Sequence, residues 1–115
     1  MARLGGSSFV IAPGQGSWQL ETRRGTLMNG AAAEHIREAI PVLSGFADVL
    51  GIRSFAGLTD LEEDVSDSTF AAMAELATVP LVNLESAIDH PCQALGDWRT
   101  LDDLAVPAAG GRFVL

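Results

Sequence analysis

The sequence predicts an α/β fold, an incomplete doubly wound domain built on a parallel sheet. Short β-type runs alternate with amphipathic segments along the chain, an order typical of βαβ crossovers and mainly parallel sheets. The length of 115 residues is enough for one domain, in which roughly 65% of the unfolded surface is buried. A hydrophobic content of 48% agrees with a domain that has buried strands.

The region before residue 51 contains the best candidate helix. Apolar residues recur at spacings of three and four over 32–50, so we expect an amphipathic helix that Pro41 interrupts and Gly51 ends. The segments before it are less regular. They are a helix end at 1–4 that Gly5 and Gly6 stop, a strand at 8–12, a Pro/Gly loop at 13–17 and an irregular stretch at 18–30.

The rest of the chain alternates strands with helices. The expected segments are a strand at 52–55, an acidic, exposed stretch at 59–66, a helix at 69–78, a strand at 79–84, a helix from Asp89 to about Leu104, a turn at 107–111 and the beginning of a strand at 112–115. Asp89 is suited to the N-cap of the last helix. Pro91 is suited to its first turn, where a missing N–H costs nothing.

Composition excludes several functional classes. The chain has seven basic and 15 acidic residues, and its net charge of -8 argues against nucleic acid or an anionic membrane as a partner. No run approaches the ~20 apolar residues of a membrane span. The single Cys excludes an internal disulfide framework and fits a reducing, cytoplasmic compartment. Two His and one Cys show no metal-ligand spacing, so we expect no metal site.

The stretch His-Pro-Cys-Gln at 90–93 is the strongest candidate for a functional site. It follows the apolar run 81–84, which ends at Glu85. His90 and Gln93 are therefore expected at a helix N-terminus just past the carboxyl end of a strand. Ligands of open α/β sheets bind there, and helix N-termini favour anions. The alternative interpretation is a solvent-exposed helix start with an incidental His.

Several motifs follow one another along the chain. They are Leu-Gly-Gly-Ser-Ser-Phe-Val-Ile-Ala-Pro-Gly-Gln-Gly-Ser-Trp at 4–18, Gly-Thr-Leu-Met-Asn-Gly at 25–30, Glu-His at 34–35, Gly-Ile-Arg-Ser-Phe at 51–55, Val-Asn-Leu-Glu at 82–85 and His-Pro-Cys-Gln at 90–93. Together they resemble the aspartate/ornithine carbamoyltransferase family, and within it the N-acylornithine branch. The resemblance implies transfer of the carbamoyl group of carbamoyl phosphate to the δ-amine of N-succinyl- or N-acetylornithine in arginine biosynthesis, without a cofactor.

The resemblance implies catalytic roles for Arg53, His90 and Gln93. Arg53 would bind carbamoyl phosphate, because a guanidinium fork can hold phosphate and carbonyl oxygens together. His90 would donate a hydrogen bond to the carbamoyl oxygen, on which charge builds during the reaction, and Gln93 would orient the carbamoyl NH2. The alternatives are a surface ion pair between Arg53 and the acidic stretch 60–67, and a capping or core role for His90.

Three further residues are implied to bind substrate. Glu85 would contact the acylornithine, and Trp18 would reach the active site of a neighbouring subunit in a homotrimer. The alternative for Glu85 is a helix-cap or turn carboxylate, and the alternative for Trp18 is a core aromatic. The resemblance places an acidic residue at position 33 in the acetyl enzymes and a small or imino residue in the succinyl enzymes. Ala33 therefore slightly favours the succinyl substrate, whereas the His-Pro-Cys-Gln motif is closer to the acetyl enzymes, and both substrates stay open.

The resemblance also implies an incomplete chain. Residues 1–109 would form a partial carbamoyl-phosphate-binding domain without its N-terminal Ser-x-Arg-Thr-Arg phosphate loop. Residues 110–115 would begin the missing ornithine-binding domain. We therefore expect the chain to be inactive by itself. The rival hypothesis is a non-catalytic βαβ remnant that acts as an interaction module.

Overall fold

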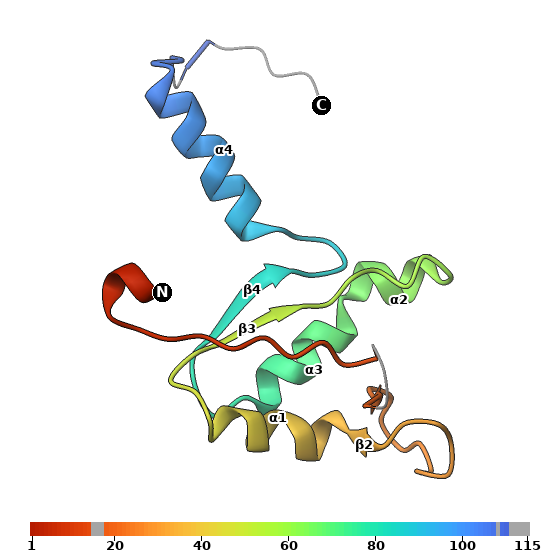
Figure 1. Ribbon diagram of the computed structural model, residues 1–115. Helices are drawn as coiled ribbons and strands as arrows, with labels where there is room; N and C mark the ends of the chain where they lie inside the picture. Colours follow the sequence, from red (N-terminus) through yellow and green to blue (C-terminus); the bar gives the residue numbers. More distant parts are fainter. Residues whose placement is uncertain (15–17, 108, 111–115) are drawn as a thin grey trace.

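The computed structural model describes residues 1–14, 18–107 and 109–110, and it confirms the α/β fold with parallel strands (Figure 1). Its elements are η1 (Ala2–Leu4), β1 (Leu20–Glu21), β2 (Glu34–His35), α1 (Ile36–Ser44), β3 (Leu50–Arg53), α2 (Leu61–Ser66), α3 (Ser68–Leu76), β4 (Leu81–Glu85) and α4 (Pro91–Asp103). The strand predicted at 112–115 and part of the turn at 107–111 lie outside the described residues.

The strands form two parallel pairs. β1 pairs with β2, and β3 pairs with β4 in a register that runs from Leu50 opposite Leu81 to Arg53 opposite Glu85. α2 and α3 form the crossover that joins β3 to β4, as a parallel connection requires. The consequence for function is that β3 and β4 end at the same edge, so Arg53 and Glu85 are neighbours.

The buried apolar residues of the described part belong to α1. Ile36, Ala39 and Ile40 are each at most 4% exposed, and their helix packs against α3. The hydroxyl of Ser44 donates to the carbonyl of Ile40 and accepts the N–H of Thr78, which fixes the end of α1 beside the chain that enters β4. Burying a side chain such as Ile contributes about 1.5–3 kcal/mol, so α1 anchors the strands to the crossover.

The helix predicted over 32–50 is too long at both ends. His35 ends β2 and then caps α1, because its ring Nδ1 accepts the N–H of Arg37 at 3.1 Å. The N–H of Ala33 donates to the carbonyl of Gln19, so the preceding chain is held beside the β1 strand rather than wound into a helix. Gly45 ends the helix, and Leu50 already belongs to β3.

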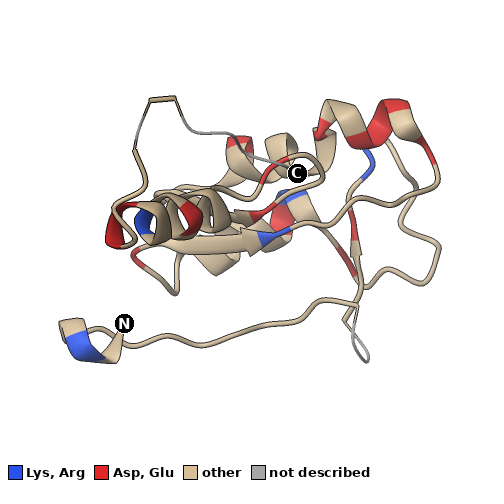
Figure 2. Cartoon of the chain, turned by 90° about the horizontal axis from the view of Figure 1, so that it is seen from above, with Lys and Arg blue, Asp and Glu red and all other residues tan. Residues whose placement is uncertain are grey.

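The N-terminal region agrees with the sequence prediction at residues 1–4 and differs from it at residues 8–12. Gly5 adopts a left-handed φ of 78° and its N–H donates to the carbonyl of Ala2, which confirms the predicted stop after residues 1–4. Residues 8–12 do not form a strand. They run along the outside of the body with Phe9 and Val10 exposed, and they are set apart from the rest of the chain in Figure 2. An apolar run without a neighbouring strand gains no ladder hydrogen bonds.

The acidic stretch predicted at 59–66 is exposed, as expected, and also helical. Asp60 caps α2 by accepting the N–H groups of Glu62 and Glu63. Acidic residues in a first turn are favoured by the positive end of the helix dipole. In Figure 2 much of this helix is coloured red, the colour that marks Asp and Glu. The helix at 69–78 and the strand at 79–84 are confirmed, with observed bounds at Ser68–Leu76 and Leu81–Glu85.

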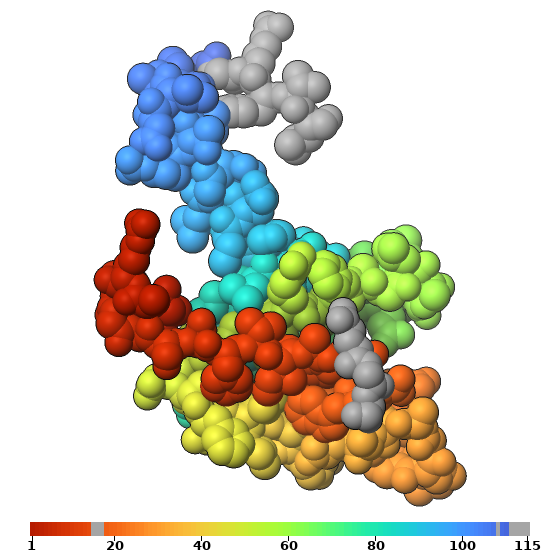
Figure 3. Space-filling view, viewed as in Figure 1, coloured from red at the N-terminus to blue at the C-terminus, as the bar shows by residue number. Residues whose placement is uncertain are grey.

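The last helix, α4, projects from the body (Figures 1 and 3). It has no buried residue, and its N-terminal end lies against β4. The predicted helix from Asp89 to about Leu104 is confirmed with bounds at Pro91–Asp103. Among the helices of the described residues, none combines the length and hydropathy needed to cross a membrane.

Candidate functional site

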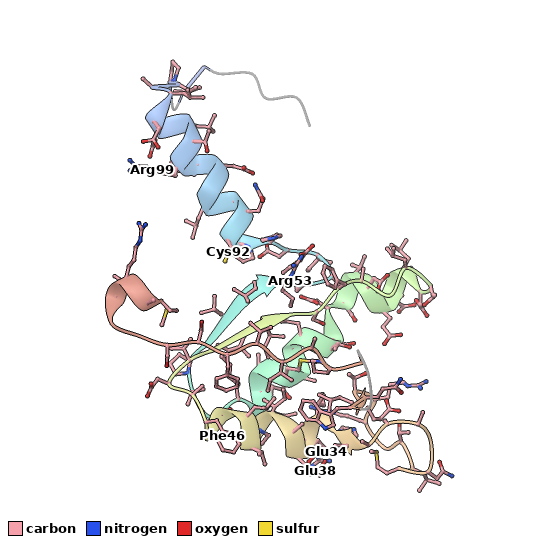
Figure 4. The ribbon with its side chains drawn as sticks, in the orientation of Figure 1. Glu34, Glu38, Phe46, Arg53, Cys92 and Arg99 are labelled. Atoms are coloured by element: carbon pink, nitrogen blue, oxygen red, sulfur yellow. The ribbon has the colours of Figure 1, made fainter. Side chains whose placement is uncertain are left out.

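Arg53 and Glu85 meet at the carboxyl ends of β3 and β4. The register of the two strands pairs these residues, and Nη2 of Arg53 forms an ion pair with Oε2 of Glu85. The side chain of Arg53 is 54% exposed and that of Glu85 is 26% exposed. Figure 4 places Arg53 at the end of the body from which α4 projects. The predicted surface ion pair of Arg53 with residues 60–67 is not observed among the described residues, because Glu85 is its partner.

His90 begins α4 and faces the same carboxylate. Its Nδ1 accepts the N–H of Gln93 at 3.1 Å, so His90 rather than Asp89 is the N-cap. Asp89 instead closes a turn, because its carbonyl accepts the N–H of Ser86. Since Nδ1 is an acceptor, the proton of the neutral imidazole lies on Nε2. That nitrogen is 3.8 Å from Oε2 of Glu85.

The chemistry of this group suits an anion or a carbonyl oxygen that gains charge. Arg53 supplies a cation, Nε2 of His90 supplies an N–H donor, and α4 supplies the positive end of a helix of 13 residues. One carboxylate oxygen of Glu85, Oε2, pairs with Arg53 and lies 3.8 Å from Nε2 of His90. We refer to Arg53, Glu85 and His90 as the strand-end group.

Gln93 lies one turn into α4, and only its backbone N–H, which donates to His90, is joined to the strand-end group. Its side-chain Nε2 donates to Oδ1 of Asp97 at 2.8 Å, along the helix. The predicted role of Gln93 in orienting a carbamoyl NH2 stays a prediction. Cys92 has an exposed side chain whose Sγ donates to the carbonyl of Asn83 at 3.7 Å.

Trp18 and Ala33 form a second group elsewhere on the chain. The indole N–H of Trp18 donates to Oε2 of Glu34 at 3.3 Å, and the N–H of Ala33 donates to the carbonyl of Gln19. Beside them, residues 19–23 and 26–32 line a hollow of about 520 Å³. Figure 4 shows Glu34 and Arg53 at opposite ends of the body. A single chain therefore does not bring Trp18 onto the strand-end group.

The loop beside this hollow is held by Glu21. The N–H of Arg23 is the main cause of a lowered pKa for this carboxyl, because it donates to the ionised form. The N–H of Thr22 and the guanidinium of Arg23 act in the same direction. Within the described residues, no group of three His, Cys, Asp or Glu side chains could hold a metal ion.

Sequence reasoning missed three contacts around these groups. Glu34 accepts the indole N–H of Trp18, and Asp67 accepts the N–H of Ala87 in the turn that leads to His90. Neither could be found from spacing, because the partners are distant in sequence. The third is local: Cζ of Arg53 lies over the ring of Phe55, 4.6 Å from its centre. Residues two apart along an extended chain share a side, so this contact had a signal in the sequence.

The chain is an α/β domain whose strand-end group lies at the carboxyl ends of parallel strands, the edge at which open α/β sheets bind ligands. The family model described as aspartate/ornithine carbamoyltransferase, carbamoyl-P binding domain, matches residues 1–103. The chain therefore belongs to the aspartate/ornithine carbamoyltransferase family, which confirms the resemblance seen in its motifs.

Curated relatives point to the N-acylornithine branch. The chain is 36% identical over 100 residues to the N-succinylornithine carbamoyltransferase of Bacteroides thetaiotaomicron, covering 87% of this chain and 31% of the relative. It is 39% identical over 101 residues to the N-acetylornithine carbamoyltransferase of Xanthomonas campestris pv. campestris, covering 88% of this chain and 30% of the relative. The chain thus spans less than a third of the length of these relatives.

Solved structures agree with this assignment. A crystal structure of acetylornithine transcarbamylase complexed with acetylcitrulline matches with a TM-score of 0.85 at 34% identity, covering 96% of this chain and 33% of that one. A variant of N-acetyl-L-ornithine transcarbamylase with alanine in place of a glutamate, complexed with carbamyl phosphate and N-succinyl-L-norvaline, also matches with a TM-score of 0.85, at 35% identity. It covers 96% of this chain and 33% of that one.

Proposed function

We propose that this chain is part of an N-acylornithine carbamoyltransferase. The reaction transfers the carbamoyl group of carbamoyl phosphate to the δ-amine of N-acetyl- or N-succinylornithine, as a step of arginine biosynthesis. The observation that carries the proposal is the strand-end group itself. A cation and an N–H donor converge on one carboxylate oxygen, in a chain that belongs to this family.

Arg53 and His90 both bind carbamoyl phosphate, and both contact its carbonyl oxygen. The guanidinium of Arg53 binds phosphate and carbonyl oxygens together. Nε2–H of His90 donates to the carbamoyl oxygen. The δ-amine attacks the carbonyl carbon, the new C–N bond forms, the C–O bond to phosphate breaks, and the amine loses a proton. A donor aimed at the oxygen that gains charge contributes about 3 kcal/mol of transition-state stabilisation in comparable sites.

Glu85 and Gln93 complete the substrate contacts. In the unliganded chain the carboxylate of Glu85 pairs with Arg53, and the amide of Gln93 donates to Asp97. Glu85 contacts the acylornithine once the phosphate has taken its place on Arg53. Gln93 orients the carbamoyl NH2 after its amide leaves Asp97. Neither step needs a metal or a redox cofactor.

The active site is shared between subunits of a homotrimer. The separation of Trp18 and Ala33 from the strand-end group supports this, because the two groups lie at opposite ends of the body (Figure 4). A neighbouring copy that presents Trp18 to the strand-end group completes the site. Both acyl groups occur among the relatives' names, and a glutamate-to-alanine variant holds a succinyl analogue in a solved structure. That structure supports an apolar residue such as Ala33 beside a succinyl group.

Residues 1–109 then form part of the carbamoyl-phosphate-binding domain, and residues 110–115 begin the ornithine-binding domain of a cytoplasmic enzyme. The family match supports the assignment of residues 1–103 to the carbamoyl-phosphate-binding domain. Carbamoyl transfer by the longer protein tests the function directly. We expect citrulline-type products from N-acetylornithine or N-succinylornithine and not from free ornithine. Transfer to free ornithine alone would refute the assignment to the N-acyl branch.

A further inference from the structure

We propose that Phe55 is a positioning residue that holds the guanidinium of Arg53 in place for the bound anion. The inference rests on the proposed anion-binding role of Arg53. It adds a residue that acts through its contact with the guanidinium of Arg53.

The contact is direct. Cζ of Arg53 lies 4.6 Å from the centre of the Phe55 ring, within the range of a cation–π interaction. The chain between the two residues is fixed, because the N–H of Ser54 donates to the carbonyl of Glu85 at 2.7 Å. This hydrogen bond continues the pairing with β4 past the end of β3. Arg53 and Phe55 therefore stay on the same side of an extended segment.

The exposure of Phe55 shows that this side chain does not serve to pack the core. Phe55 is 65% exposed, although a large apolar side chain gains by burial. Its ring does not belong to the buried core, which is made of α1 residues. The guanidinium above the ring is therefore the contact that gives this exposed aromatic side chain a defined role.

The contact with the ring uses no N–H donor of the guanidinium. An aromatic ring contacts the flat face of a guanidinium, whereas carboxylates and phosphates bind its edge in the plane. Glu85 accepts from Nη2, and within the described residues Nε and Nη1 of Arg53 have no protein partner. Phe55 thus restricts the orientation of the plane without using a donor. Pre-ordering a long side chain lowers the entropy lost when the anion binds.

A titration of this chain with inorganic phosphate, followed by NMR, tests the proposal. Phe55→Leu keeps an apolar side chain but removes the ring. We expect its phosphate affinity to fall by about two- to fivefold, the size of an exposed cation–π contact. Phe55→Trp and Phe55→Tyr keep a ring and should retain the affinity. Phe46→Leu is the matched control, because Phe46 is also exposed, at 71%, and lies far from Arg53 (Figure 4).

A second readout follows the guanidinium itself. The Nε–Hε group of Arg53 should become more mobile in Phe55→Leu, with unchanged amide spectra for α1 and β4. If Phe55 had a purely structural role, Phe55→Leu would alter those amide spectra. Phe55→Trp and Phe55→Tyr would then lose phosphate affinity as well. An unchanged affinity and an unchanged Arg53 mobility in Phe55→Leu would overturn the proposal.

Arg53→Gln separates this inference from the proposed function. If Arg53→Gln loses phosphate binding and Phe55→Leu does not, the anion site stands and the role of Phe55 is wrong. If the unsubstituted chain does not bind phosphate, or Arg53→Gln binds it equally well, the anion site is wrong and Phe55 has nothing to position. In an Arg53→Lys background the effect of Phe55→Leu should shrink, because a lysine presents no flat face to the ring.

Discussion

Nε2 of His90 lies 3.8 Å from Oε2 of Glu85, the same oxygen that pairs with Arg53. The two groups best suited to bind an anion therefore share one internal carboxylate. An incoming phosphate has to compete with that carboxylate for Arg53, because both ligands bind guanidinium edges in the same way. In the free chain Glu85 opposes anion binding, whatever it contacts later in the reaction.

Removing the charge of Glu85 should consequently strengthen anion binding. We expect Glu85→Gln to raise the affinity of this chain for phosphate by about threefold, in line with the small net strength of partly exposed ion pairs. NMR titration at constant ionic strength measures the change. Arg99 and Asp103 form an ion pair within α4 at 2.7 Å, so Asp103→Asn is a matched control that should leave the affinity unchanged. A weaker affinity in Glu85→Gln would show that the carboxylate supports the anion.

The chain alone should catalyse no measurable carbamoyl transfer. Within its 115 residues it contains no Ser-x-Arg-Thr-Arg motif. Trp18 is bonded to Glu34, which lies away from Arg53 in Figure 4. Positioning both substrates is what this reaction needs most. Steady-state assays with carbamoyl phosphate and each acylornithine measure the activity. Turnover above the blank would contradict the view that this chain is one part of the site.

His90 should matter for the chemical step. In the longer protein, His90→Ala should lower kcat by roughly 10²-fold or more, as the loss of one oxyanion donor does. The KM for the acylornithine should change less, since Nε2–H is aimed at the carbamoyl oxygen. His90→Ala also removes the N-cap that Nδ1 provides to Gln93. His90→Asn, which can cap a helix, serves as the control that keeps α4 in place. A wild-type kcat in both variants would leave His90 with a structural role only.

Local sequence signals placed part of the strand-end group. The apolar run that ends at Glu85, followed by Pro91, indicates a strand end and a helix start. The strand predicted at 52–55 is wrong by two residues, because β3 spans Leu50–Arg53 and pairs from Leu50 onward with β4. The choice of cap between Asp89 and His90 was not decided by residue type. It depends on the turn that Ser86 and Asp89 close through a backbone hydrogen bond.

Contacts between distant segments limited the rest of the prediction. Apolar periodicity predicted a helix over 32–50, which is too long. Periodicity carries no information about the hydrogen bond from Ala33 to Gln19 or about the capping of α1 by His35. The bond between Trp18 and Glu34 joins residues 16 apart, and no spacing rule predicts it. The Phe55 stack on Arg53 was predictable in principle from strand alternation.

Trp18 should act across a subunit boundary. In the longer protein, Trp18→Ala should reduce activity, and so should Arg53→Ala. Mixed oligomers of the two variants should recover part of the activity, because one shared site can then receive both intact groups. The composition of the oligomers is verified by native mass spectrometry before the assay. If verified mixed oligomers stay inactive, Trp18 belongs to the site of its own subunit.

Position 33 should control the choice of acyl group. Ala33 is exposed and lies beside Trp18 through the hydrogen bond to Gln19. A carboxylate at this position would repel the terminal carboxylate of a succinyl group, and like charges in a partly dry site cost up to several kcal/mol. An acetyl group carries no charge and should be tolerated.

We therefore expect Ala33→Glu, in the longer protein, to lower kcat/KM for N-succinylornithine far more than for N-acetylornithine. A competition assay with both substrates reads this directly as a ratio of kcat/KM values. Ala33→Gln is the matched control, because it adds the same bulk without the charge. Equal losses in the Glu and Gln variants would assign the effect to size. A ratio that does not move in either variant would mean that position 33 does not line the acyl pocket.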